Sequence, residues 1–207
     1  KEDSLPDIFN LGFIIAEPIA EPQFDLLDAE IWSVFPPSQV ITPDDVRGNA
    51  ATLEQAVLSS GWPSLAAARG KVLFLLDNGG GKRTQYQRGH TSLEGLPVFT
   101  NSSPGNADAA FVKSNDPEGA ANQAAINGLV QDGYLVRTRA DGDTVQSRSG
   151  STAQRDAALA SGAQYVSTDY PVADPRFTTY SVAIPGGPAR CNPINAPVGC
   201  RTIGVAP

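Results

Sequence analysis

The chain has 207 residues, of which 41% are hydrophobic and 18% charged, and its formal net charge is -7. This length suits one substantial domain, and the composition is that of an ordinary globular protein, which argues against disorder. Its 15 basic residues are scattered, whereas general nucleic-acid binding needs clustered Lys and Arg, so that class is excluded. A single phosphorylated substrate is not excluded.

The N-terminal part of the chain carries no sign of a membrane anchor. No apolar run approaches the roughly 20 residues of a membrane-spanning helix. The first residue is Lys1 and the chain contains no Met, so we expect a processed or partial polypeptide. Residues 1–23 are rich in Pro and acidic residues and predict an extended connection.

The next part of the chain predicts helices. Apolar residues recur at three- and four-residue steps from Phe24 through Leu27 to Phe35 and predict an amphipathic helix, which the following Pro pair ends. Thr42, followed by Pro and two acids, predicts a short capped helical turn, and Thr52 predicts a second one. We therefore interpret these acids as helix caps rather than metal ligands.

Five short apolar runs predict β-strands, at residues 71–76, 96–100, 109–113, 134–138 and 165–168. The run at 71–76 is continuous, which is typical of a strand covered on both faces. Helices are predicted at 118–132 and 152–161, and a polar loop at 143–150. Crossovers of this length favour parallel pairing, so the fold class is α/β, an open sheet or part of a barrel.

Two motifs invite a catalytic interpretation that we reject. Gly79-Gly80-Gly81-Lys82 resembles part of a phosphate-binding loop, but Arg83 stands where that loop needs Ser or Thr. We predict a flexible surface loop instead. His90 is the only His in the chain, and because no partner for it is evident nearby, we predict a surface residue rather than a general base.

Charged and polar residues gather where the predicted strands end. The candidates are Asp77, Arg137, Arg139, Asp141, Asp169 and Tyr170. Arg137 and Arg139 lie two residues apart, so on a strand they project to the same face. In an α/β barrel the carboxyl ends of the strands meet at one rim, where active sites are built. A structural network of Arg and Asp that seals this rim is an equally strong alternative for each residue.

The C-terminal residues 172–207 predict a surface tail. Cys191 and Cys200 enclose a short Pro- and Asn-rich loop, which suits a disulfide, and no neighbouring His or Cys supports a metal site. An oxidised, secreted protein is therefore expected. Asn101-Ser102-Ser103 is a glycosylation sequon that is compatible with secretion.

Several segments carry a resemblance: LDAEI at 27–31, ITPDDVRG at 41–48, GWP at 61–63 with RGKVLFLLD at 69–77, VRTRAD at 136–141, ASGAQ at 160–164 with STDY at 167–170, and RCNP at 190–193. Over nearly the whole chain they resemble the secreted calcium-dependent phosphatidylinositol-specific phospholipase C family. The resemblance implies a distorted (β/α)8 barrel of the TIM type, with this chain as its C-terminal portion of about five parallel strands.

The resemblance also implies a phosphoric diester hydrolase that cleaves phosphatidylinositol to diacylglycerol and a cyclic inositol phosphate. That chemistry needs one imidazole as base, another as acid and a Ca²⁺ ion, and His90 alone cannot supply both imidazoles. In the family these groups lie upstream of the segment that corresponds to Lys1. We therefore expect the chain to be inactive without an N-terminal half, its partner, and to act transiently at a membrane surface.

On this resemblance the rim binds the substrate through Lys1, Asp77, Arg137, Arg139, Asp141, Asp169 and Tyr170. Guanidinium groups suit a phosphate, carboxylates suit inositol hydroxyls or the arginines, and the Tyr ring suits stacking. Residues 1–23 would be a connection, 24–171 half of the barrel, and 172–207 the clipped tail. The alternatives are a non-catalytic half-barrel that binds an inositol phosphate or a sugar and, more weakly, a barrel of another family.

Overall fold

The computed structural model describes residues 12, 18–59, 61–187 and 189–205. Its strands are β1 (Phe74–Leu76), β2 (Val98–Thr100), β3 (Phe111–Lys113), β4 (Leu135–Arg139) and β5 (Tyr165–Ser167). The pairs β1·β2, β3·β4 and β4·β5 are all parallel. Isolated parallel bridges join Asn101 to Phe111, between β2 and β3, and Val40 to Val72, ahead of β1. Strands that follow one another in the chain therefore also lie side by side.

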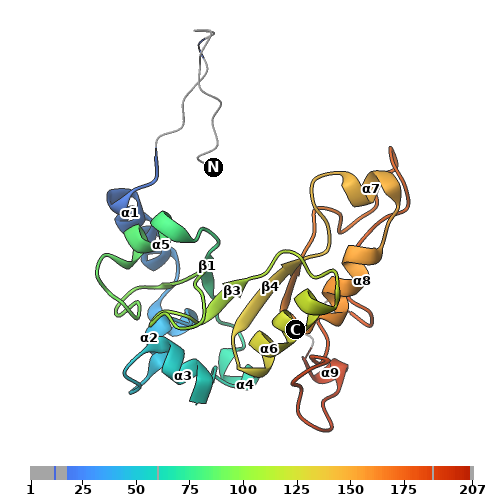
Figure 1. Cartoon of the computed structure of the whole chain (residues 1–207). Helices are drawn as coiled ribbons and strands as arrows, with labels where there is room; N and C mark the ends of the chain where they lie inside the picture. Colours follow the sequence, from blue (N-terminus) through green and yellow to red (C-terminus); the bar gives the residue numbers. More distant parts are fainter. Residues whose placement is uncertain (1–11, 13–17, 60, 188, 206–207) are drawn as a thin grey trace.

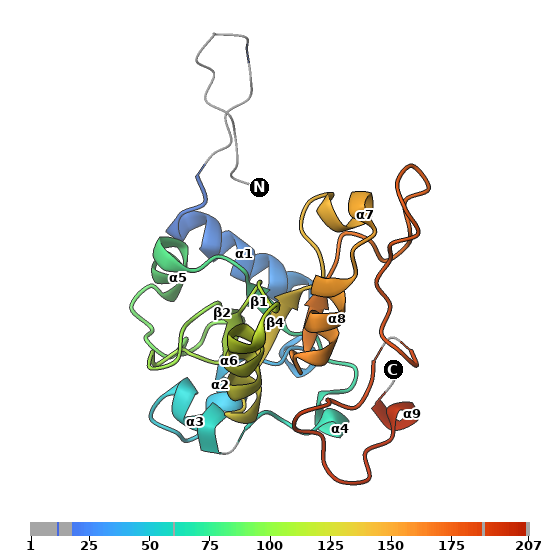
Figure 2. The same cartoon turned by 45° about the vertical axis from the view of Figure 1, so that its right-hand side comes forward.

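Helices lie above, below and beside these strands (Figures 1 and 2). They are α1 (Glu21–Val34), α2 (Pro43–Arg47), α3 (Leu53–Ser59), α4 (Leu65–Ala68), α5 (Gly80–Gln87), α6 (Ala120–Gln131), α7 (Val145–Ser149), α8 (Ala153–Ala160) and α9 (Thr202–Val205), with a 3₁₀ turn, η1, at Pro37–Gln39. In Figure 1, α1 and α7 lie above the strands and α3, α4 and α9 below them. No helix in the described part of the chain is long and apolar enough to cross a bilayer.

Local sequence explains where the first helices begin. The Thr42 hydroxyl accepts from the Asp45 amide at 3.2 Å, and the Asp45 carboxylate accepts from the Thr42 amide at 2.8 Å, which confirms the predicted cap of α2. The Thr52 hydroxyl caps α3 by accepting from the Gln55 amide at 3.1 Å. The acids of α2 thus serve the helix, as expected.

Helix α1 differs from its prediction at one end and on one face. It begins at Glu21, so residues 21–23 are helical rather than extended. Phe24 and Ile31 are buried, but Leu27, which was expected in the same stripe, is 40% exposed. Only the narrow face that meets α5 and the core is therefore covered.

The β3–β4–β5 sheet is covered on one face and open on the other. In β4, Val136 and Thr138 are fully buried, whereas Leu135, Arg137 and Arg139 are only partly so. Helices α6 and α8 both contact β4 (Figure 2). On the open face of β5, Tyr165 is 46% exposed. The described residues show parallel α/β architecture but no closed barrel.

Three expectations about local structure are wrong. β1 is only half-buried, not covered on both faces, since part of it borders the open side. Gly79–Lys82 is not a flexible loop, because α5 begins at Gly80. The predicted polar loop at 143–150 contains α7.

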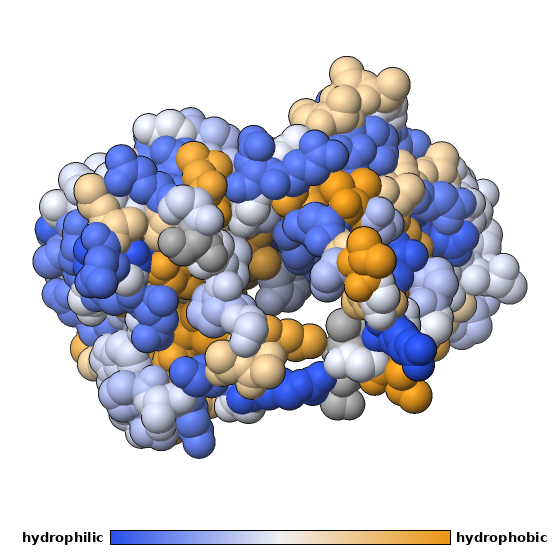
Figure 3. All heavy atoms as spheres, turned by 90° about the horizontal axis from the view of Figure 1, so that it is seen from below, coloured by the Kyte–Doolittle hydropathy of each residue, from blue (hydrophilic) through white to orange (hydrophobic). Residues whose placement is uncertain are grey.

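The C-terminal tail lies along the amino ends of the strands. Cys191 and Cys200 form the predicted disulfide. Asn192 donates to the Gly162 carbonyl at 2.7 Å, just before β5, and Asn195 donates to the Val130 carbonyl at 3.0 Å, just before β4. Seen from below, this side of the molecule is hollowed, with apolar side chains around the opening (Figure 3).

Candidate functional site

Charged side chains from three strands meet at the carboxyl ends on the open face. Asp77 directly follows β1, Lys113 ends β3, and Arg137 lies in β4. The Lys113 ammonium lies 2.9 Å from one carboxylate oxygen of Asp77, and the Arg137 guanidinium lies 3.4 Å from the other. We call Asp77, Lys113 and Arg137 the charged rim. Because the strands are parallel, their ends bring together groups that are 60 residues apart in the chain.

Two asparagines hold the charged rim in place. Asn101 donates to the Asp77 carbonyl at 3.2 Å and accepts from the Lys113 amide at 3.0 Å. Asn115 accepts from Nη1 of Arg137 at 3.0 Å. Among the described residues, Nε and Nη2 of Arg137 have no partner, so the guanidinium keeps donors for a ligand.

A pocket opens beside the charged rim on the exposed face of the sheet. Its volume is about 390 Å³, and its lining includes Asp77, Arg137, Tyr165 and Ser167 along with apolar strand residues. The lining therefore combines a charged pair with apolar side chains. Such a lining suits a polar headgroup attached to an apolar part.

Asp141 ties the end of β4 to the end of β5. Only 1% of this residue is exposed. Its carboxylate accepts from the Thr168 hydroxyl, from the Asp169 amide at 2.9 Å and from the Tyr180 hydroxyl at 3.2 Å. Burial and the charge of Asp141 raise the pKa of Tyr180. Nε of Arg139 donates to the Asp141 carbonyl at 3.0 Å.

Asp169 and Tyr170 make no hydrogen bond or ion pair to the charged rim. Asp169 is exposed. The Tyr170 ring packs edge-on against Tyr180, with centroids 5.9 Å apart, and its hydroxyl donates to the Asp143 carbonyl at 3.0 Å. Lys1 lies outside the described residues. His90 is exposed, as predicted.

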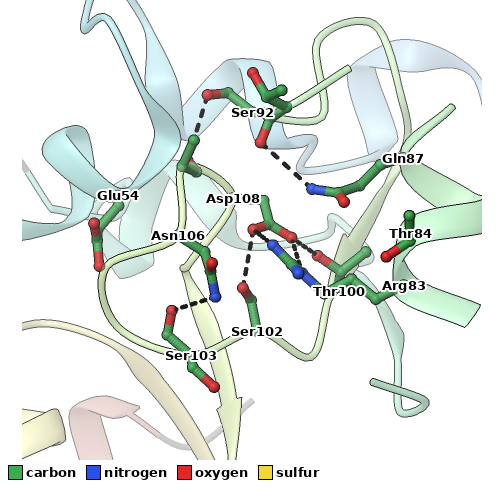
Figure 4. A network of polar contacts seen from close by, with 12 residues as sticks. Glu54, Arg83, Thr84, Gln87, Ser92, Thr100, Ser102, Ser103, Asn106 and Asp108 are labelled. Carbon is green, nitrogen blue, oxygen red and sulfur yellow. Dashed lines mark hydrogen bonds and ion pairs between the residues drawn. The ribbon is translucent and has the colours of Figure 1, made fainter. Parts of the chain in front are cut away.

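A buried ion pair lies under the end of β2 (Figure 4). Asp108 is fully buried and pairs with Arg83, whose Nε lies 2.7 Å from one carboxylate oxygen. The hydroxyls of Thr100 and Ser102 donate to it at 2.6 and 2.9 Å. Burial alone would raise the pKa of Asp108, but the hydrogen bonds from Arg83, Thr100 and Ser102 outweigh it and lower the pKa.

One model of a known protein family matches most of the chain. The family model for phosphoinositide phospholipase C, Ca²⁺-dependent, matches residues 2–193. The chain belongs to this family. No curated protein and no solved structure gave a significant match.

The family is described as Ca²⁺-dependent, so we asked whether these residues fit a calcium ion. In the part of the chain that the structure describes, no three His, Cys, Asp or Glu side chains cluster in a way that would hold a metal. Calcium needs several free oxygen ligands, yet Asp77, Asp108 and Asp141 are each bonded to cations or hydroxyls. The described residues therefore do not fit the ion.

Sequence reasoning missed several residues of the charged rim, of its supports and of the buried ion pair. Lys113, Asn101 and Asn115 were not selected, although each stands at the end of an apolar run, as Asp77 does. This shared position at the end of an apolar run is the sequence signal that would have identified them. Asp108 has a weaker signal, a single acid beside Ala residues ahead of the third strand. Its partner Arg83 is 25 residues away, and only the fold brings the two together.

Proposed function

We propose that this chain supplies the headgroup-binding rim of a calcium-dependent phosphatidylinositol-specific phospholipase C. The observation that carries the proposal is the convergence of Asp77, Lys113 and Arg137 beside a pocket, in a chain of this family. Two cations and one carboxylate match a ligand that carries both a phosphate and hydroxyl groups.

The reaction defines what else the enzyme needs. The 2-hydroxyl oxygen of inositol attacks phosphorus, the bond from phosphorus to the diacylglycerol oxygen breaks, and the hydroxyl proton ends on that oxygen. The products are a cyclic inositol phosphate and diacylglycerol. A base and an acid must move the proton, and the only imidazole of the chain, His90, is exposed on the turn after α5. We place both proton-transfer groups and the Ca²⁺ ligands in an N-terminal half of the same enzyme.

The residues of this chain then take different roles in the proposal. Arg137 and Lys113 bind the phosphodiester, and Asp77 accepts from ring hydroxyls while it orients both cations. Arg139 and Asp169 lie at neighbouring strand ends and would contact the ring.

Asp141 positions these strand ends, because it is buried and its carboxylate is hydrogen-bonded. Tyr170 would stack on the inositol ring only with the part of its own ring that does not pack against Tyr180. Lys1 stays a prediction.

The open face of the sheet supports the proposal of an N-terminal partner, and the disulfide supports the proposal of secretion. The face of β4 and β5 opposite α6 and α8 is open, and residues 24–171 then form part of a barrel that a second segment completes. The Cys191–Cys200 disulfide is typical of an oxidising, extracellular compartment. A secreted enzyme of this type would meet its lipid at a membrane surface.

Binding of the headgroup tests this proposal. Glycerophosphoinositol, a soluble diester, is titrated into the chain by calorimetry. We expect Arg137→Gln to weaken binding at least tenfold, because it removes the cation nearest the pocket. Arg176→Gln is the matched control, since the Arg176 side chain is 80% exposed and its one ion pair among the described residues is with Asp174, and it should change the affinity less than twofold. Equal effects of the two variants would refute the assignment.

The alternative is a half-barrel that binds an inositol phosphate or a sugar without turnover. The two are separated by adding Ca²⁺, phosphatidylinositol and a polypeptide that carries the N-terminal half. The proposal expects inositol phosphate release only from the mixture. Binding without release from the mixture favours the alternative, and robust release by the isolated chain contradicts our placement of the catalytic groups.

A further inference from the structure

The chain contains two Asn-Gly pairs, Asn78-Gly79 and Asn127-Gly128. Asn is a thermolabile residue, most of all before Gly, because a residue without Cβ lets its backbone nitrogen approach the preceding side chain. The first pair lies in the connection from β1 to α5, and the second lies inside α6 (Figure 1). We infer that Asn78 is a site of spontaneous deamidation and that its conversion weakens the charged rim.

The reaction needs water as its only co-reactant. The backbone nitrogen of Gly79 bonds to Cγ of Asn78 and gives up its proton, the bond from Cγ to Nδ2 breaks, and ammonia leaves. The product is a succinimide ring, which water then opens. Opening at Cγ gives an aspartate, and opening at the main-chain carbonyl gives an isoaspartate, whose main chain runs through the former side chain. Either product carries a carboxylate where the amide stood.

The structure leaves both reacting groups of the first pair free. Asn78 and Gly79 are exposed. Among the described residues, the Asn78 side chain makes no hydrogen bond and the Gly79 amide donates none. Gly79 precedes the first turn of α5 and has an extended backbone, with φ -95° and ψ -160°. No helix or strand therefore holds the attacking nitrogen.

The second pair has the same sequence in a different environment. Gly128 lies inside α6, where each backbone amide donates to the carbonyl four residues earlier. Its nitrogen is therefore engaged in the helix, and the helical backbone of Asn127 keeps Cγ from reaching it. The pair in α6 thus serves as an internal control for the effect of structure.

Asn78 lies between two segments that touch the same support of the charged rim. The carbonyl of Asp77 accepts from Nδ2 of Asn101 at 3.2 Å and from Nζ of Lys113 at 2.8 Å. On the other side, a Cβ built on Gly79 would lie 3.5 Å from the same Nδ2 of Asn101. An isoaspartate lengthens the main chain between these two contacts, so both cannot keep their present geometry.

The new carboxylate also changes the charge at the rim. The rim holds two cations, Lys113 and Arg137, and one carboxylate, Asp77. A second anion on the residue next to Asp77 compensates the remaining positive charge, which weakens the attraction for an anionic phosphodiester. This effect on binding rests on the proposed function, whereas the reaction at Asn78 does not.

Ageing of the chain at mildly alkaline pH tests the site, with both Asn-Gly peptides followed by mass spectrometry that distinguishes isoaspartate. We expect Asn78 to convert at least tenfold faster than Asn127. Gly79→Ala should slow the conversion of Asn78 at least tenfold, and it should fold, because its φ suits Ala and the new Cβ meets no atom closer than 3.5 Å. Gly128→Ala is the matched control and should change the rate at Asn78 less than twofold.

Unfolding separates structure from sequence in this experiment. In guanidinium chloride, where α6 no longer protects its pair, the two Asn residues should convert at rates within threefold of each other. Equal rates in the folded chain, or a rate at Asn78 that Gly79→Ala leaves unchanged, would overturn the inference.

Binding of glycerophosphoinositol by calorimetry tests the consequence. Aged wild type should bind at least threefold more weakly than fresh wild type, and Gly79→Ala should keep its affinity on ageing. Fresh Asn78→Asp carries the charge without the longer main chain and should also bind at least threefold more weakly. Conversion of Asn78 with unchanged affinity would overturn the effect on the rim. Fresh wild type that does not bind would instead refute the proposed function and leave the reaction at Asn78 supported by its rates.

Discussion

Among single residues, Asp108 is a fully buried carboxylate whose charge the fold has to compensate. A buried carboxylate is costly unless cations and hydrogen bonds compensate it. Here Arg83 and two hydroxyls do so, and they also fix the end of β2. The residue thus links stability to the geometry of the strand ends.

Asp108→Asn should lower the free energy of unfolding by about 3 kcal/mol, because it leaves the Arg83 charge without its partner. Urea unfolding at pH 7 measures this change. Asp132→Asn, at an exposed residue, is the control and should change stability by less than about 0.5 kcal/mol.

The same carboxylate predicts a pH dependence. Its pKa in the folded state lies below the unfolded value of 3.8, so its ionised form stabilises the fold above that value. The contribution disappears as the pH falls through the lower folded-state pKa. In unfolding measured from pH 5 downwards, the wild type should lose stability more steeply than Asp108→Asn. Parallel curves would contradict the assignment.

Among the elements, the tail depends on a close contact with the segment before β5. Gly162 has φ +78°, and a Cβ built there would lie 2.3 Å from Cγ1 of Ile194 in the disulfide loop. Only Gly adopts this backbone conformation easily and leaves room for Ile194. The glycine therefore lets the tail pack on the amino ends of the strands.

Gly162→Ala should destabilise the chain by about 2–3 kcal/mol, from backbone strain together with the clash. Thermal unfolding of Gly162→Ala, Ile194→Ala and the double variant forms a cycle. We expect the double variant to be more stable than the sum of the single effects, because Ile194→Ala removes the clash. Strict additivity would show that the two residues do not touch.

At the scale of the whole molecule, the open face of the sheet determines whether the chain associates in solution. Tyr165 is 46% exposed on the edge strand β5, beside the 390 Å³ pocket. Exposed strand edges and apolar surface promote association. The proposed N-terminal half would cover both.

We therefore expect the isolated chain to elute as a dimer or larger species in size-exclusion chromatography with light scattering. Addition of the N-terminal half should convert it to a one-to-one complex, because the new strands cover the open face. A monomer that stays monomeric and does not bind the added half would contradict this prediction.

The sequence alone determined the parallel strands, the caps at Thr42 and Thr52, the disulfide and the family, because these depend on local patterns and short spacings. It also indicated that polar groups at strand ends would meet. Only the tertiary structure decided which of them do: Lys113 joined Asp77 and Arg137, whereas Asp141 became a buried tie between strands. The physical reason is that ion pairing and burial depend on distances between segments far apart in the chain, which no local pattern contains.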